Sequence, residues 1–213
     1  MFGSYDFIAR LYPVLERAAF GSALTEARNA SLKRVISAEQ ALLIGEGNGR
    51  FLADCIKAKI GGSITIVDAS ERMLSLARSR ICGFHLQTEL KFVHADFREW
   101  RSSEPHFDVI VTHFFLDLFR PESQRRVIEN ITAHSTANTI WMNVDSRPVI
   151  QSPLHRLIDW LQYRFDRLFS GIEAERHYDS AAIIQELGWR VQHEQAFCSN
   201  AVFSHVLTRF NAH

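Results

Sequence analysis

Three glycines alternate with other residues at positions 45, 47 and 49, and this spacing is the first chemical signal in the chain. Residues 41–44 before them are apolar, and helical spacing begins at residue 50, which predicts a buried strand, a turn and a helix N-terminus. Glycines accept positive φ and let a ligand lie against bare backbone, and the free N–H groups of the helix start add partial positive charge. The stretch therefore predicts a site for a nucleotide-like cofactor.

Two aspartates follow the next two predicted strands, 63–67 and 90–93. Asp68 can accept hydrogen bonds from both ribose hydroxyls, and Asp96 can accept one from an exocyclic amine of adenine. The alternatives are a solvated strand end for Asp68 and a helix cap for Asp96. Because the glycine turn precedes them, the ribose reading of Asp68 is favoured. Arg50 occupies the position of the third glycine of a dinucleotide motif, so the spacing argues against NAD.

His113 follows the fourth predicted strand, 107–112, at the edge of the sheet where ligands bind. Its imidazole is a candidate general base near neutral pH. If this stretch is helical, Asp117 lies one turn later and can orient it. The alternative is that residues 112–117 simply form a pocket wall. Candidates on the substrate side are Tyr5, Tyr12, Arg147 and His155.

Predicted strands and helices alternate from residue 41 to residue 144, which indicates a parallel α/β sheet. A helix over 180–187 and two closing strands, 189–195 and 201–210, are expected to follow, with antiparallel pairing because their connection is short. We expect a single domain over 1–213. A helical lid at 1–38 and a helical insertion at 147–172 lie outside the alternation.

Composition narrows the function classes. The chain has 213 residues, 46% of them hydrophobic, with 24 Lys and Arg balanced by 24 Asp and Glu. This neutral balance argues against a nucleic-acid partner. We expect no transmembrane segment and no metal site, a cytoplasmic location, and a small-molecule partner, with a homodimer left open. Asp145 is the one carboxylate visible for a magnesium-dependent site.

The ordered motifs resemble the class I S-adenosylmethionine-dependent methyltransferases over about residues 41–210. The resemblance rests on residues 42–49 for the cofactor glycines, 67–74 for the ribose, 94–97 for the adenine, 107–111 for the fourth strand and 187–191 for the closing helix-glycine-strand. It implies a doubly wound, mostly parallel seven-stranded sheet, Rossmann-like, with the last strand antiparallel. It also implies methyl transfer to an oxygen, nitrogen or carbon of a small, apolar or aromatic molecule, with S-adenosylhomocysteine as product.

The resemblance assigns cofactor contacts along the expected edge of the sheet. They are Gly45, Glu46, Gly47, Asn48, Gly49, Asp68, Ala69, Met73, Asp96, Phe97, Thr112 and His113. Leu43 stands where the family has an acidic residue, and we expect Glu46 to take over its polar role. The alternatives are a non-catalytic, methyltransferase-like binding or regulatory domain, and an NAD-dependent oxidoreductase.

Overall fold

The structure is a computed structural model that describes residues 22–35, 38–58, 62–102, 106–146, 178–198 and 200–210. The first 21 residues and residues 147–177 are outside these ranges. The predicted substrate residues Tyr5, Tyr12, Arg147 and His155 and the predicted insertion at 147–172 therefore lie outside the described residues, as does most of the predicted lid.

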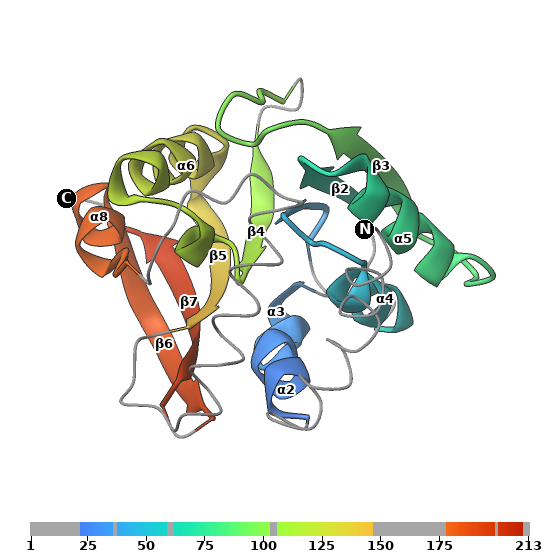
Figure 1. Cartoon of the computed structure of the whole chain (residues 1–213), viewed down its shortest axis with the longest axis horizontal. Coiled ribbons are helices and arrows are strands. Elements are labelled where there is room, and N and C mark those ends of the chain that lie inside the picture. Colours follow the sequence, from blue (N-terminus) through green and yellow to red (C-terminus); the bar gives the residue numbers. More distant parts are fainter. Residues whose placement is uncertain are drawn as a thin grey trace, which may run out of the picture.

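Seven strands form one twisted sheet in the order β3-β2-β1-β4-β5-β7-β6 (Figure 1). Their bounds are Gln40–Ile44 for β1, Ser63–Asp68 for β2, Glu89–His94 for β3, Phe107–His113 for β4, Ser135–Ser146 for β5, Trp189–Phe197 for β6 and Val202–Arg209 for β7. Strands β1 to β5 pair in parallel, and β7 runs antiparallel to both β5 and β6. The predicted fold class, including the antiparallel last strand, is confirmed.

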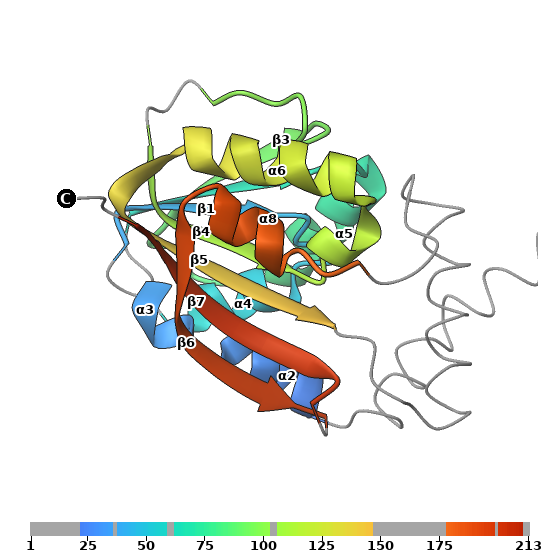
Figure 2. The ribbon, with the colours of Figure 1, turned by 90° about the vertical axis from the view of Figure 1, so that its left-hand side faces the viewer.

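Helices cover both faces of the sheet, with α6 and α8 on one side and α2 and α4 on the other (Figure 2). The helix bounds are Ala23–Asn29 for α2, Leu32–Val35 for α3, Arg50–Lys57 for α4, Glu71–Ile81 for α5, Pro121–Ala133 for α6 and Ala181–Glu186 for α8, and η1 is a 3-10 turn at Leu116–Leu118. Apolar side chains of β1, β2 and β4 fill a core on each face, as expected for parallel strands covered on both sides.

Local signals set the starts of α5 and α6. Ser70 caps α5 by accepting a hydrogen bond from the Met73 N–H at 3.3 Å, and Pro121 occupies the first turn of α6. The described part of the predicted lid contains two short helices, because α2 ends at Asn29 and α3 begins at Leu32. Asn29 and Ser31 are poor helix formers, and the Asn29 side chain instead bonds Asp54 of α4.

Candidate active site

The order of the sheet reverses between β1 and β4, since the chain builds outward from β1 to β3 and then returns to place β4 on the other side. In doubly wound sheets the crevice at the carboxyl ends of two such strands receives the ligand. Ile44 pairs with Thr112 at this edge, so the glycine turn after β1 and His113 at the end of β4 are brought together. The topology thus assembles residues that the sequence analysis selected separately.

The three glycines of the turn have positive φ, at 62°, 67° and 78°, and each position has different surroundings. A Cβ on Gly49 would lie 2.7 Å from the Ala77 Cα, so Gly49 is needed for the close packing of α4 on α5. A Cβ on Gly45 would lie 2.3 Å from the ring of Phe115. A Cβ on Gly47 would meet no described atom within 4 Å, so this side of the turn leaves room for a ligand.

Glu46 extends its side chain toward the helix that follows the turn. Its Oε1 accepts the Leu52 N–H at 3.0 Å, which satisfies a free donor in the first turn of α4. Gly49, at the N-cap, has no side chain that could do this. Burial raises the pKa of Glu46 to about 7, although the Leu52 hydrogen bond and the charge of Arg28 oppose the rise. The side chain is a helix cap as well as a candidate ligand.

Asp68 ties the glycine turn to the end of β2. Its Oδ2 accepts the Gly47 N–H at 3.1 Å, and its Oδ1 accepts the Ser70 N–H at 2.8 Å. Burial raises the pKa of this carboxyl, and the two backbone donors oppose that rise. Each carboxylate oxygen has two acceptor sites, so both oxygens can still accept from ribose hydroxyls. The predicted ribose carboxylate therefore has a fixed orientation beside the open position at Gly47.

Asp96, the predicted adenine carboxylate, is held by Arg98. Both oxygens accept from the Arg98 Nε at 3.0 Å, and Oδ1 also accepts the Arg98 N–H at 2.9 Å. These hydrogen bonds lower the pKa of Asp96, which is therefore an ionised acceptor. The Arg98 guanidinium also lies over the ring of Phe119, 5.4 Å from its centroid. An adenine amine would have to share the carboxylate with Arg98.

The remaining residues predicted on this side of the turn contribute in different ways. Met73 is half-buried in the first turn of α5, close to Ser70 and thus to the end of β2. The Phe97 side chain is buried in the core against Trp100 and His134, so only its backbone remains for a cofactor contact. The carbonyl groups of Asn48 and Ala69 accept hydrogen bonds from Arg80 and His94, respectively.

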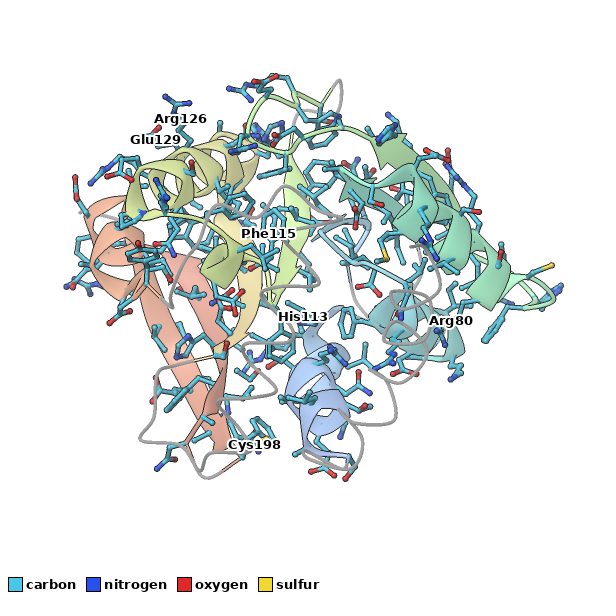
Figure 3. All side chains as sticks on the ribbon, viewed as in Figure 1. Arg80, His113, Phe115, Arg126, Glu129 and Cys198 are labelled. Carbon is cyan, nitrogen blue, oxygen red and sulfur yellow. The ribbon has the colours of Figure 1, made fainter. Side chains whose placement is uncertain are left out.

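His113 is buried, with 8% of its surface exposed, and neither ring nitrogen has a hydrogen-bond partner among the described residues. The edge of its ring meets Phe51 of α4, with the ring centroids 4.5 Å apart. Figure 3 shows it beside the end of β4, toward α2. Burial, and secondarily the charge of Arg28, lowers the pKa of His113 to about 3. At neutral pH this is an uncharged imidazole with unsatisfied hydrogen-bonding capacity in the interior.

The expected contact between His113 and Asp117 is not formed. His113 ends a strand rather than lying in a helix, and its side chain is on the face of Val111 and α4. Asp117 is in η1, where its Oδ2 accepts from the Ser146 Oγ at 2.8 Å. The prediction that Asp117 orients His113 is therefore wrong in its geometry, because neither ring nitrogen of His113 has a partner among the described residues and the Asp117 carboxyl accepts from Ser146 instead.

Asp117 instead pairs with Asp145 of β5. A hydrogen bond joins the two carboxyls, and burial together with the charge of Asp117 raises the pKa of Asp145 well above its usual range. Two carboxyls this close disfavour the ionisation of both at once. Asp117 is the second carboxylate beside Asp145, which the sequence did not reveal. Among the residues that the structure describes, however, no group of three or more His, Cys, Asp or Glu has the arrangement of a metal site.

Thr112 has a structural environment. Its fully buried Oγ1 donates to the Asn143 Oδ1 at 2.8 Å and accepts from the Trp141 Nε1 at 2.8 Å. Both partners are on β5, on the face that packs against α6. The side chain of Thr112, predicted to contact the cofactor, is therefore not available to a ligand.

One residue at the crevice, Arg28, has no signal in the sequence, and another, Phe115, belongs to the predicted pocket wall at 112–117. Arg28 of α2 lies with its guanidinium carbon 5.0 Å from the ring centroid of Phe114, which directly follows β4. Phe115 covers Gly45, and Figure 3 places it between β4 and η1. Phe114 has a φ of 53°, which is rare for an aromatic residue and directs the chain sharply away from β4. No local pattern marks Arg28, because it reaches the crevice only when α2 packs against α4 and β7.

Residues 41–137 match a family model described as a methyltransferase domain. No curated protein shows a significant match to the sequence. The matched segment extends from β1 to the beginning of β5 and contains the glycine turn, Asp68, Asp96 and His113. The resemblance to the class I methyltransferases is confirmed.

Solved structures of similar fold include methyltransferases. Mitomycin 7-O-methyltransferase is 19% identical with a TM-score of 0.66, over 95% of this chain and 60% of that one. The N-methyltransferase NodS from Bradyrhizobium japonicum, solved with S-adenosyl-L-homocysteine, is 15% identical with a TM-score of 0.64, over 93% of this chain and 97% of that one. A protein from Pyrococcus horikoshii is 15% identical with a TM-score of 0.67, over 98% and 100%. At these identities the likeness establishes the fold alone, and this chain spans only about 60% of the length of the mitomycin enzyme.

None of the helices in the described ranges has the length and apolar character needed to cross a membrane.

Proposed function

We propose, from the methyltransferase-domain match and the fold, that the protein transfers a methyl group from S-adenosylmethionine to an oxygen, nitrogen or carbon atom of a small molecule. One observation carries the proposal. Asp68 accepts a hydrogen bond from the Gly47 N–H, and a Cβ on Gly47 would meet no described atom within 4 Å. This arrangement fits a nucleoside, because a fixed carboxylate can accept from two ribose hydroxyls while bare backbone admits the ligand. When bound, S-adenosylmethionine supplies a methyl group that is already electrophilic.

The crevice residues divide between holding the cofactor and holding the acceptor. Gly47, Asp68, Met73 and Asp96 would hold the nucleoside part. On the β4 side the surroundings are largely aromatic, with Phe51, Phe114, Phe115 and Phe119 near the end of the strand. Aromatic walls favour a small apolar or aromatic acceptor. The printed name of mitomycin 7-O-methyltransferase, a protein of the same fold, also denotes a small-molecule acceptor.

His113 is the group of this chain that we assign to the acceptor. A hydroxyl or amine that gains a methyl group loses one proton. An imidazole whose pKa is about 3 holds a proton only weakly, so His113 orients the acceptor by accepting its hydrogen bond, and the proton passes to solvent. Asp117 does not take part through His113, because it is paired with Asp145 and Ser146.

Calorimetry with S-adenosylhomocysteine tests the proposal. Wild-type protein is expected to bind, and Asp68→Ala is expected to lower the affinity by about 30-fold to 100-fold, the size of a lost charge-assisted contact. Glu129→Ala on the exposed face of α6 is the matched control, since it removes a carboxylate far from the crevice (Figure 3). No binding by the wild type, or equal affinities for all three proteins, would contradict the proposal.

A binding domain without catalysis is the second candidate, and Leu43 supports it. Leu43 is fully buried in the core on the α4 side, so the position gives no polar contact to a cofactor. Incubating the protein with radiolabelled S-adenosylmethionine and a metabolite extract separates the two functions. Label in any small molecule, absent with Asp68→Ala, establishes catalysis. Cofactor binding without transfer to any acceptor favours the binding domain.

A further inference from the structure

The position of Arg28 on α2 is fixed by the contacts of the residues immediately before and after it. The preceding residue, Ala27, is fully buried against Val144 of β5 and Val202 of β7. The following residue, Asn29, donates from its Nδ2 to the Asp54 Oδ2 of α4 at 3.0 Å. Because its two neighbours anchor the helix, Arg28 is held at the carboxyl edge of the sheet rather than being a freely moving surface cation.

The Arg28 guanidinium meets groups from two other elements at the crevice. It lies over the Phe114 ring, 5.0 Å from the centroid, immediately after β4. Its positive charge also lowers the pKa of Glu46 in the glycine turn and that of His113 at the end of β4. Three segments far apart in the sequence thus place a cation, a carboxyl and a neutral imidazole within electrostatic reach of one another.

This combination suits the charges of an α-amino acid. The guanidinium presents paired donors that match a carboxylate, and a carboxylate such as that of Glu46 accepts from an ammonium group. His113 adds no positive charge that would compete with Arg28 for the carboxylate. Asp68 lies on the β2 side of the turn, whereas Arg28 lies on the β4 side. The two sides therefore offer different chemistry, one for sugar hydroxyls and one for a zwitterion.

We propose that Arg28 binds the α-carboxylate of the cofactor's methionine portion, with Glu46 accepting from the neighbouring ammonium group. This assignment rests on the proposed function. It also accounts for the absence of an acidic residue at position 43. Glu46, after the first glycine, would contact the ammonium group, and Arg28, on a helix outside the β-α alternation, would contact the carboxylate.

Three ligands and matched variants test the assignment by calorimetry at one pH. S-adenosylhomocysteine carries both charged groups, decarboxylated S-adenosylmethionine lacks the carboxylate, and 5′-methylthioadenosine lacks the amino-acid portion. Arg28→Gln is expected to weaken S-adenosylhomocysteine at least tenfold and to leave the other two within about twofold. Glu46→Gln is expected to weaken the two ligands that carry an amine. Arg34→Gln, an exposed arginine of α3, should change none of them.

The other outcomes distinguish failure of the Arg28 assignment from failure of the proposed function. Equal losses for S-adenosylhomocysteine and 5′-methylthioadenosine in Arg28→Gln would mean that Arg28 acts through the fold, and no loss would mean that it makes no contact. Either result overturns the assignment and leaves the proposed function standing. If the wild type binds none of the three ligands, the proposed function itself fails. Arg28→Lys keeps the charge and the anchored helix, and it should give an intermediate loss for S-adenosylhomocysteine alone.

Discussion

The two sides of the crevice differ in how their polar groups are satisfied. On the β2 side, Asp68 and Asp96 accept from donors only two residues away, Ser70 and Arg98. On the β4 side, His113 is buried without a partner among the described residues, and the adjacent Phe114 has a strained φ. Short-range hydrogen bonds make the first side a rigid, prepared surface. On the second side the buried imidazole of His113 has hydrogen-bonding atoms that no described residue satisfies, which is typical of the part of a site where chemistry occurs.

The glycine turn gives the largest expected effect. Gly49→Ala is expected to lower the free energy of unfolding by about 4 kcal/mol, because the new Cβ meets the Ala77 backbone at a φ of 78°. Gly47 has a similar φ of 67°, but the Cβ added in Gly47→Ala would meet no described atom within 4 Å, so this substitution should cost only about 1 kcal/mol. Urea unfolding of the two variants measures the difference. Similar losses would contradict the distinct roles of the two glycines.

Acid should act on the β4 side through His113. Between its folded pKa of about 3 and its unfolded value of 6.5, the unfolded chain binds the extra proton, so stability falls as pH is lowered. From pH 6.5 to pH 4 this amounts to about 3 kcal/mol. His113→Phe keeps a ring against Phe51 and removes the titration. Between pH 6.5 and pH 4, the unfolding free energy of this variant should therefore fall by about 3 kcal/mol less than that of the wild type. Parallel pH curves for wild type and variant would count against a buried neutral imidazole.

The contribution of Glu46 to the pH dependence of stability should have the opposite sign. Its folded pKa of about 7 lies above the ordinary value of 4.5, so the folded chain holds the extra proton and stability is lost as pH rises from 4.5 through 7. Partial exposure limits the change to about 2 kcal/mol. Glu46→Gln retains an acceptor for the Leu52 N–H and should abolish this slope in denaturant titrations between pH 4.5 and 8. An unchanged slope would show that the carboxyl stays ionised.

Thr112→Val separates an effect on stability from an effect on binding. Thr112→Val leaves the Trp141 and Asn143 side chains without their common partner and should cost about 1.5 kcal/mol of unfolding free energy. Affinity for S-adenosylhomocysteine should stay within about twofold, because the side chain is turned away from the crevice. A tenfold loss of affinity in calorimetry would return Thr112 to the cofactor contacts.

The sequence by itself determined the sheet and the β2 side of the site. Alternating apolar runs and helical stripes fixed the order of the elements, and Gly47, Asp68 and Asp96 were identifiable because each lies close to the carboxyl end of a strand. Their main hydrogen bonds are short-range or lie within the adjoining strand-turn units, so local patterns predict them well.

Only the tertiary structure decided the β4 side. The fold leaves His113 without a hydrogen bond to Asp117, joins Asp117 to Asp145, and brings the charge of Arg28 near the glycine turn from a helix outside the alternation. None of these contacts has a characteristic spacing in the sequence. Burial and packing create them and also set the pKa values of Glu46 and His113, since desolvation depends on every element that surrounds a group.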